Sequence, residues 1–134
     1  MTGLNLLVAD DDPAMRLWLQ IMLARMGASV RLASSGWELL FMLADDLATI
    51  DLVITDVRMP IPSGFDVLAM ARSAGVTIPF VLITAFSNEE LRVAARRMRA
   101  SVLDKPFLVD DLEARIRDLL GPRAASTNAD RPPS

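Results

Sequence analysis

Short runs of apolar residues alternate along the chain with longer stretches in which apolar side chains recur at helical spacing. The short runs predict five strands, at residues 4–9, 29–33, 52–55, 79–84 and 101–103. The amphipathic stretches predict five helices, at residues 13–26, 36–44, 64–74, 87–98 and 108–120. Because the strands are almost continuously apolar, both faces of their sheet should be covered. The pattern therefore predicts an α/β fold, a doubly wound parallel sheet with helices on both faces.

Residues typical of helix ends mark several of these boundaries. Asp12 is predicted to cap the first helix, Ser87 to open a capping box for the fourth, and Gly121 to end the last. The residues after Gly121 are mostly small or polar and include several prolines. We therefore expect one domain over residues 1–121, and a disordered tail or the start of a linker over residues 122–134.

Polar side chains follow the predicted strands where each one ends. Asp10 and Asp11 come after the first strand, and Asp56 comes after the third. Thr84 ends the fourth strand, and Lys105 follows the fifth. The carboxyl ends of the strands in such a sheet lie at one edge, where ligands bind, so these side chains should meet there.

Composition narrows the chemistry of this edge. The chain has no His and no Cys, which excludes the commonest general base, thiolate metal sites and Cys nucleophiles. Oxygen ligands alone favour a hard cation such as Mg²⁺, which also relieves the repulsion among converging carboxylates. Lys105 is the sole lysine among 14 basic residues, and its compact ammonium suits a phosphate. The set indicates a site for covalent phosphorylation on an Asp.

Five motifs then occur in an order and spacing that resemble the receiver domains of two-component response regulators. The resemblance runs from about residue 4 to residue 120 and rests on these stretches: Leu7-Val8-Ala9-Asp10-Asp11-Asp12-Pro13, Thr55-Asp56-Val57-Arg58-Met59-Pro60, Ser63-Gly64-Phe65-Asp66, Ile83-Thr84-Ala85 and Asp104-Lys105-Pro106-Phe107. It implies a flavodoxin-like, chemotaxis-regulator-like fold with five strands in the order 2-1-3-4-5.

The resemblance also implies a metal site. Asp11 is expected to bind Mg²⁺ directly and Asp10 largely through water, with Asp56 and the backbone carbonyl of Arg58 as further ligands. Mn²⁺ is the alternative ion.

The remaining roles implied by the resemblance concern the phosphoryl group. Asp56 is expected to take it from a phosphohistidine on a sensor histidine kinase or a histidine phosphotransfer protein. Lys105 should pair with the bound phosphoryl group, and Thr84 should turn inward to hydrogen-bond it. The Lys105–Pro106 peptide bond is expected to be cis.

The chain departs from the family pattern at two positions. Val102 stands where receivers commonly carry an aromatic residue that rotates with the Thr, so we expect the switch to depend on the fourth helix and the loop before it. Ser101 stands where many dimerising receivers carry an Asp, which leaves a monomer or weak dimer. Arg58 and Phe86 are bulky at positions that influence water access in the family, which predicts slow hydrolysis of the phosphoryl group.

Partners follow from the same resemblance and from charge. The net charge of −3 and a pI of about 4.8 argue against nucleic-acid binding. No apolar run is long enough to span a membrane, so we expect a cytoplasmic protein. Arg92, Arg96 and Arg99 recur at helical spacing on the fourth helix, which with the fifth strand and fifth helix is expected to meet an unknown output protein.

The resulting prediction is a regulatory phosphoacceptor domain, not an enzyme with its own substrate, although it assists its own phosphotransfer and slow autodephosphorylation. It is either a stand-alone receiver or a fragment of a longer regulator or hybrid kinase. Two alternatives stay open from sequence alone. One is a Mg²⁺-dependent phosphotransferase or phosphatase with an Asp nucleophile, and the other is a receiver-like module that is never phosphorylated.

Overall fold

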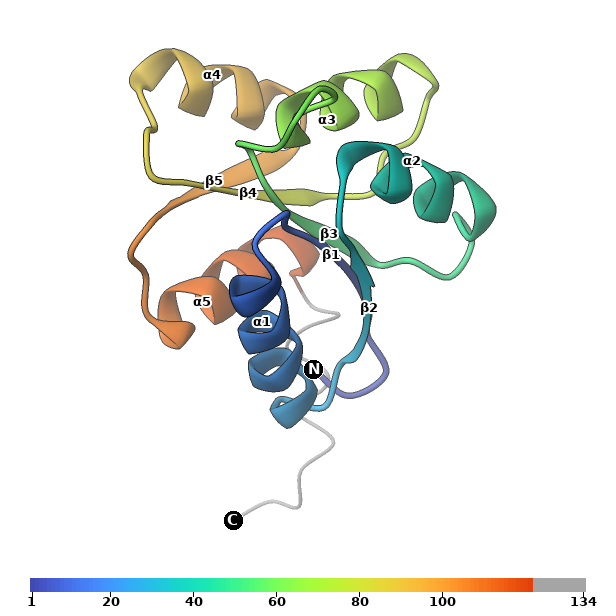
Figure 1. Ribbon diagram of the computed structural model, residues 1–134, viewed down its shortest axis with the longest axis vertical. Helices are drawn as coiled ribbons and strands as arrows, with labels where there is room; N and C mark the ends of the chain where they lie inside the picture. The colour runs from blue at the N-terminus through green and yellow to red at the C-terminus, as the bar shows by residue number, and fades with distance from the viewer. Residues whose placement is uncertain (122–134) are drawn as a thin grey trace.

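Five parallel strands form one sheet in the order β2-β1-β3-β4-β5 in the computed structural model, which describes residues 1–121 (Figure 1). The strands are β1 (Asn5–Ala9), β2 (Ser29–Ala33), β3 (Leu52–Asp56), β4 (Phe80–Thr84) and β5 (Ala100–Asp104). The helices that connect and follow them are α1 (Pro13–Arg25), α2 (Gly36–Asp45), α3 (Gly64–Ser73), α4 (Glu89–Arg97) and α5 (Val109–Leu120). The expected strand order and fold class are confirmed.

The helices cover both faces of the sheet, with α1 and α5 on one side and α2, α3 and α4 on the other (Figure 1). Alternate residues of the central strands accordingly enter two separate cores. Leu6 and Ile54 pack in one core with Leu19 of α1 and Ile116 of α5. The residues adjacent to these in the strands, such as Leu7 and Val53, pack in the other core with side chains of α2 and α3. This double burial explains the continuously apolar strand sequences.

The helix ends agree with the sequence prediction at most positions. The Asp12 side chain caps α1 by accepting a hydrogen bond from the Ala14 N–H, 3.0 Å away. The prediction for α4 was wrong by one residue, because Asn88 and not Ser87 is the N-cap, and the Asn88 side chain accepts from the Leu91 N–H. Both residue types cap helices well, so local sequence did not discriminate between them.

The arginine row predicted on α4 is shorter than expected. The helix ends at Arg97, and Arg99 lies beyond it with a φ of +54°. A non-glycine residue in this left-handed region leaves the helical spiral, so Arg99 does not continue the face formed by Arg92 and Arg96.

Two sequence expectations concern features away from the sheet. The tail or linker predicted over residues 122–134 lies outside the described part of the chain. No helix among residues 1–121 combines the length and the apolar character that a membrane crossing requires.

Candidate acidic site at the carboxyl edge of the sheet

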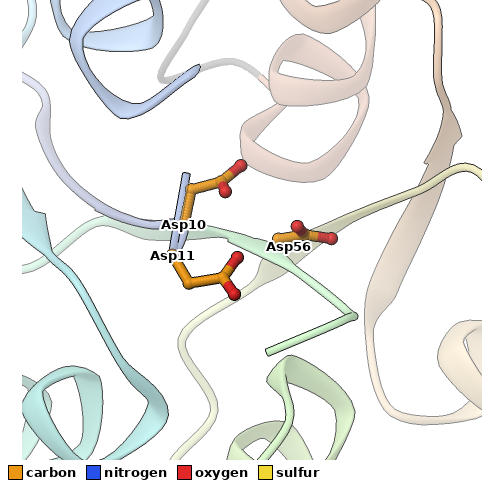
Figure 2. A group of neighbouring side chains, drawn as sticks. All are labelled: Asp10, Asp11 and Asp56. Carbon is orange, nitrogen blue, oxygen red and sulfur yellow. The ribbon is translucent and has the colours of Figure 1, made fainter. Parts of the chain in front are cut away.

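Three carboxylates meet at the carboxyl ends of the two neighbouring strands β1 and β3 (Figure 2). Asp10 and Asp11 follow β1, and Asp56 is the last residue of β3. One oxygen from each of the three side chains lies within 4.8 Å of the others. The structure therefore brings together the three aspartates that the sequence placed at this edge.

Asp10 is the buried member of this group. Its side chain is 1% exposed, and its Oδ1 accepts a hydrogen bond from the Asp12 N–H at 2.9 Å. Its Oδ2 is buried without a hydrogen-bond partner. Burial raises the pKa of Asp10 above its ordinary value, and the charges of Asp56 and Asp11 raise it further, while the Asp12 N–H and Lys105 act against this rise.

The Oδ2 atom of Asp10 is the observation that tests whether a cation fits here, because it has no hydrogen-bond partner and the Lys105 ammonium is 3.8 Å away. A buried carboxylate oxygen without a partner is costly, and a bound cation would satisfy it. The neighbouring donors are carboxylate oxygens of Asp11, which is exposed, and of Asp56. Such a donor set, without nitrogen or sulfur, fits Mg²⁺ or Mn²⁺.

Lys105 is in contact with the same carboxylates from the end of β5. Its Nζ lies 3.3 Å from Asp56 Oδ2 and 3.8 Å from Asp10 Oδ2. Its backbone N–H donates to the Thr84 carbonyl at 2.8 Å, which holds the residue against the end of β4. The Lys105–Pro106 peptide bond is cis, as the resemblance implied, and Ile61–Pro62 is also cis, which the sequence did not indicate.

Thr84 is buried at the end of β4, and its hydroxyl is already engaged. It accepts a hydrogen bond from the Phe86 N–H at 3.1 Å. A rotation of this side chain towards Asp56 would break that hydrogen bond.

Three contacts hold the acidic residues in place, and the sequence alone did not indicate them. Arg16 donates to the Asp10 carbonyl at 2.8 Å. The Arg58 N–H donates to Asp56 Oδ1 at 3.1 Å. Gly64 begins α3 so close to β3 that a Cβ there would lie 2.1 Å from the Asp56 carbonyl oxygen. Any larger residue at Gly64 would push α3 away from the site.

Arg58 and Phe86 contact each other across this edge of the sheet. The Arg58 guanidinium lies 4.2 Å from the centre of the Phe86 ring, a cation–π contact between the loops after β3 and β4. The sequence singled out both residues by position, and their contact is a finding of the structure.

An apolar groove of about 590 Å³ opens beside Lys105. Its walls include Met15 and Trp18 of α1 and Phe107 of the β5–α5 loop. The Trp18 and Phe107 rings pack edge to face, with their centres 5.8 Å apart.

A doubly wound parallel sheet with carboxylates and a lysine at its carboxyl edge defines a class of α/β proteins that bind ligands at that edge. The chain belongs within that class to the response regulator receiver domain family, whose family model matches residues 6–117. It is thus a signalling domain of two-component systems. Receiver domains of this family bind Mg²⁺ at an acidic pocket, and this chain has a cluster of three aspartates at the carboxyl edge of its sheet.

Individual relatives agree with this assignment. The chain is 40% identical over 118 residues to the response regulator MprA of Mycobacterium avium, covering 87% of this chain and 51% of that protein. It spans about half the length of the curated relatives it matches. A receiver domain protein from Clostridium thermocellum superposes with a TM-score of 0.82 at 27% identity, covering 92% of this chain and 98% of its own. The Francisella response regulator 1452 receiver domain gives 0.79 at 26% identity, with 89% and 98% covered.

Proposed function

We propose that Asp56 accepts a phosphoryl group from a phosphohistidine on a sensor histidine kinase or a histidine phosphotransfer protein. The observation that carries this proposal is that the Asp56 carboxylate lies within 4.8 Å of oxygens of Asp10 and Asp11 and also 3.3 Å from the ammonium of Lys105. Asp56 is the one carboxylate of the group within 3.5 Å of that ammonium, at 3.3 Å.

The transfer step conserves atoms and charge. An Asp56 carboxylate oxygen forms the new P–O bond while the P–N bond to the partner's imidazole breaks, and the bonding pair stays on that nitrogen. The Arg58 N–H orients the carboxylate through its Oδ1. A bound Mg²⁺, or Mn²⁺, held by Asp10, Asp11, Asp56 and the backbone carbonyl of Arg58, would neutralise the charge that gathers on the phosphoryl oxygens.

Lys105 and Thr84 bind the phosphoryl group once it is attached to Asp56. The new acyl phosphate brings a charge of roughly −1.5 to −2 into the site. Lys105, already beside Asp56, pairs with a phosphoryl oxygen. Thr84 releases the Phe86 N–H and donates its hydroxyl proton to another phosphoryl oxygen.

We assign the two partners to different surfaces. The histidine-bearing partner docks on the groove formed by Trp18 and Phe107, because Lys105 lines that groove and the Lys105 ammonium lies 3.3 Å from Asp56. The output protein binds the face of α4, β5 and α5, where Arg96 and Arg115 line a cavity of about 300 Å³. Phosphotransfer from the first partner and binding of the second both take place in the cytoplasm, where sensor kinases hold their phosphohistidine.

Beryllofluoride, a mimic of the phosphoryl group, tests the proposal without a kinase. With Mg²⁺ present it should change the amide spectrum of the wild-type protein around Thr84 and Lys105, and should leave Asp56→Asn unchanged. Asp12→Asn is the matched control. Asn also caps helices, and the Asp12 side chain caps α1 and is not one of the three clustered carboxylates. A wild type that does not respond would favour the receiver-like module that is never phosphorylated.

The contact between Arg58 and Phe86 predicts a long-lived phosphoryl group. The pair bridges the two loops beside Asp56, so it restricts the path of attacking water. Phe86→Ala is expected to shorten the phosphoryl lifetime about fivefold, because water exclusion protects a reactive intermediate from hydrolysis. The decay of phosphorylated protein measured by intact mass checks this, with Phe41→Ala, an exposed phenylalanine on α2, as control. A wild-type lifetime of only seconds would contradict the prediction.

A further inference from the structure

Ser87, Arg92 and Asp104 form a hydrogen-bonded cluster that connects three separate segments. The Ser87 hydroxyl in the β4–α4 loop donates to Asp104 Oδ1 at the end of β5. The same hydroxyl accepts from Arg92 Nη2 of α4 at 2.7 Å, and Arg92 also lies 3.5 Å from Asp104 Oδ2. Each member therefore contacts both of the others.

This cluster lies next to the groups proposed to contact the phosphoryl group. Asp104 pairs with Thr84 in the register of β4 and β5, and it directly precedes Lys105. Ser87 follows Phe86, whose N–H is held by the Thr84 hydroxyl. A change at Thr84 thus reaches Ser87 through a few residues of backbone.

Position 102, through which the resemblance implies a second route from Thr84 to the surface, is occupied here by a valine. Val102, which stands at the position of the usual aromatic residue, is partly buried against the core beneath α4. Its side chain has a single rotatable bond, χ1, and cannot swing between an exposed and a buried position as an aromatic ring can.

The ion pair between Arg92 and Asp104 is weak enough to break when the protein changes conformation. The side chains of Arg92 and Asp104 are 41% and 54% exposed, and ion pairs this exposed are weak because water competes for both partners. The Ser87 hydroxyl adds specificity, because it orders the arginine and the carboxylate in one geometry.

We infer that Ser87, Arg92 and Asp104 are a latch that holds the β4–α4 loop and α4 in the resting arrangement, and that phosphorylation opens it. The inference rests on the proposed function. When Thr84 turns to the phosphoryl group it releases Phe86, the loop moves, and Ser87 leaves Asp104. Arg92 then loses one of its two partners in the cluster, and α4 is free to shift.

Thermodynamic linkage gives the latch a measurable signature. Contacts made only in the resting state oppose activation, so removing them shifts the equilibrium towards the active state. Ser87→Ala should therefore bind beryllofluoride with Mg²⁺ about fivefold more tightly than the wild type, a coupling of ordinary size. Without beryllofluoride, its amide signals in α4 should already lie part of the way towards the positions of the activated wild type.

Matched variants separate a latch from a structural contact. Arg92→Gln should behave like Ser87→Ala, and Ser87→Thr, which keeps the hydroxyl, should restore the wild-type affinity. Ser101→Ala and Arg97→Gln remove the same chemical groups at positions that take no part in the cluster, and should leave the beryllofluoride affinity unchanged. Thermal unfolding of each variant identifies any general loss of stability.

The outcomes distinguish failure of the latch from failure of the proposed function. If the wild type responds to beryllofluoride while Ser87→Ala and Arg92→Gln match it in affinity and in the positions of the α4 signals, the latch is wrong. If the wild type itself does not respond, the proposed function fails first. Tighter binding in both latch variants, reversed by Ser87→Thr, supports the inference.

Discussion

Lys105→Met is expected to produce a protein that binds Mg²⁺ more tightly than the wild type and yet no longer moves α4 when beryllofluoride binds. The Lys105 ammonium lies 3.3 Å from Asp56 and 3.8 Å from Asp10, so it competes electrostatically with a cation for the same carboxylates. Removing it should lower the Mg²⁺ dissociation constant about threefold to tenfold, because one positive charge fewer then repels the cation at this distance.

The loss of response in this variant has a separate cause. Without the ammonium the phosphoryl group lacks the partner that connects it to β5, and at least nine-tenths of the α4 amide shifts should disappear. Lys105→Arg is the informative companion, because it retains the charge but replaces a compact ammonium with a wide planar group. It should keep the wild-type Mg²⁺ affinity and lose most of the response. Normal α4 shifts in Lys105→Met would refute the role given to this residue.

Asp10→Asn is expected to have opposite effects on the metal-free and the metal-bound protein. In the absence of Mg²⁺ the Asp10 carboxylate is buried, has one oxygen without a hydrogen-bond partner and is repelled by Asp56 and Asp11, while Lys105 partly offsets this repulsion. Neutralising Asp10 should raise the free energy of unfolding by about 1–2 kcal/mol, because Asn carries no charge for burial and the neighbouring carboxylates to disfavour. The stabilisation that Mg²⁺ gives to the wild type should largely vanish in the variant.

The pH dependence of this stability difference has a defined sign. Because burial raises the pKa of Asp10, the folded protein binds a proton there more readily than the unfolded chain does. The Asp10 carboxyl therefore costs stability as pH rises through its raised folded pKa. The gap between wild type and Asp10→Asn should narrow at lower pH and be widest near neutrality. Denaturant unfolding with EDTA at several pH values measures it, and a destabilised Asp10→Asn at neutral pH would contradict the account.

The fold was predictable because burial on both faces of the sheet leaves a direct mark on the sequence. Residues such as Leu6 and Val53 had to be apolar whichever face they entered, so their strands appeared as continuous apolar runs. The site was predictable for a related reason, since strand ends in a parallel sheet converge and any polar residue there joins the others.

Sequence could not resolve how neighbouring polar residues divide their roles. Asp10 and Asp11 are adjacent carboxylates, yet one is buried and the other exposed, because Asp10 turns under the loop to accept the Asp12 N–H. Ser87 and Asn88 are both capping residues, and only the three-dimensional position of Asp104 explains why Ser87 is engaged elsewhere. Contacts between loops depend on how the loops pack, and no local pattern encodes them.

Locating the phosphoryl group tests the assignment of Asp56 as the phosphoacceptor. The protein is incubated with acetyl phosphate and Mg²⁺, its intact mass is measured, and the modified residue is identified by peptide mapping. We expect one phosphoryl group per wild-type chain, carried on Asp56, and none when EDTA removes the metal or when Asp56 is replaced by Asn. Equal uptake by Asp56→Asn, or a phosphoryl group found on Asp10 or Asp11 in the wild type, would contradict this assignment.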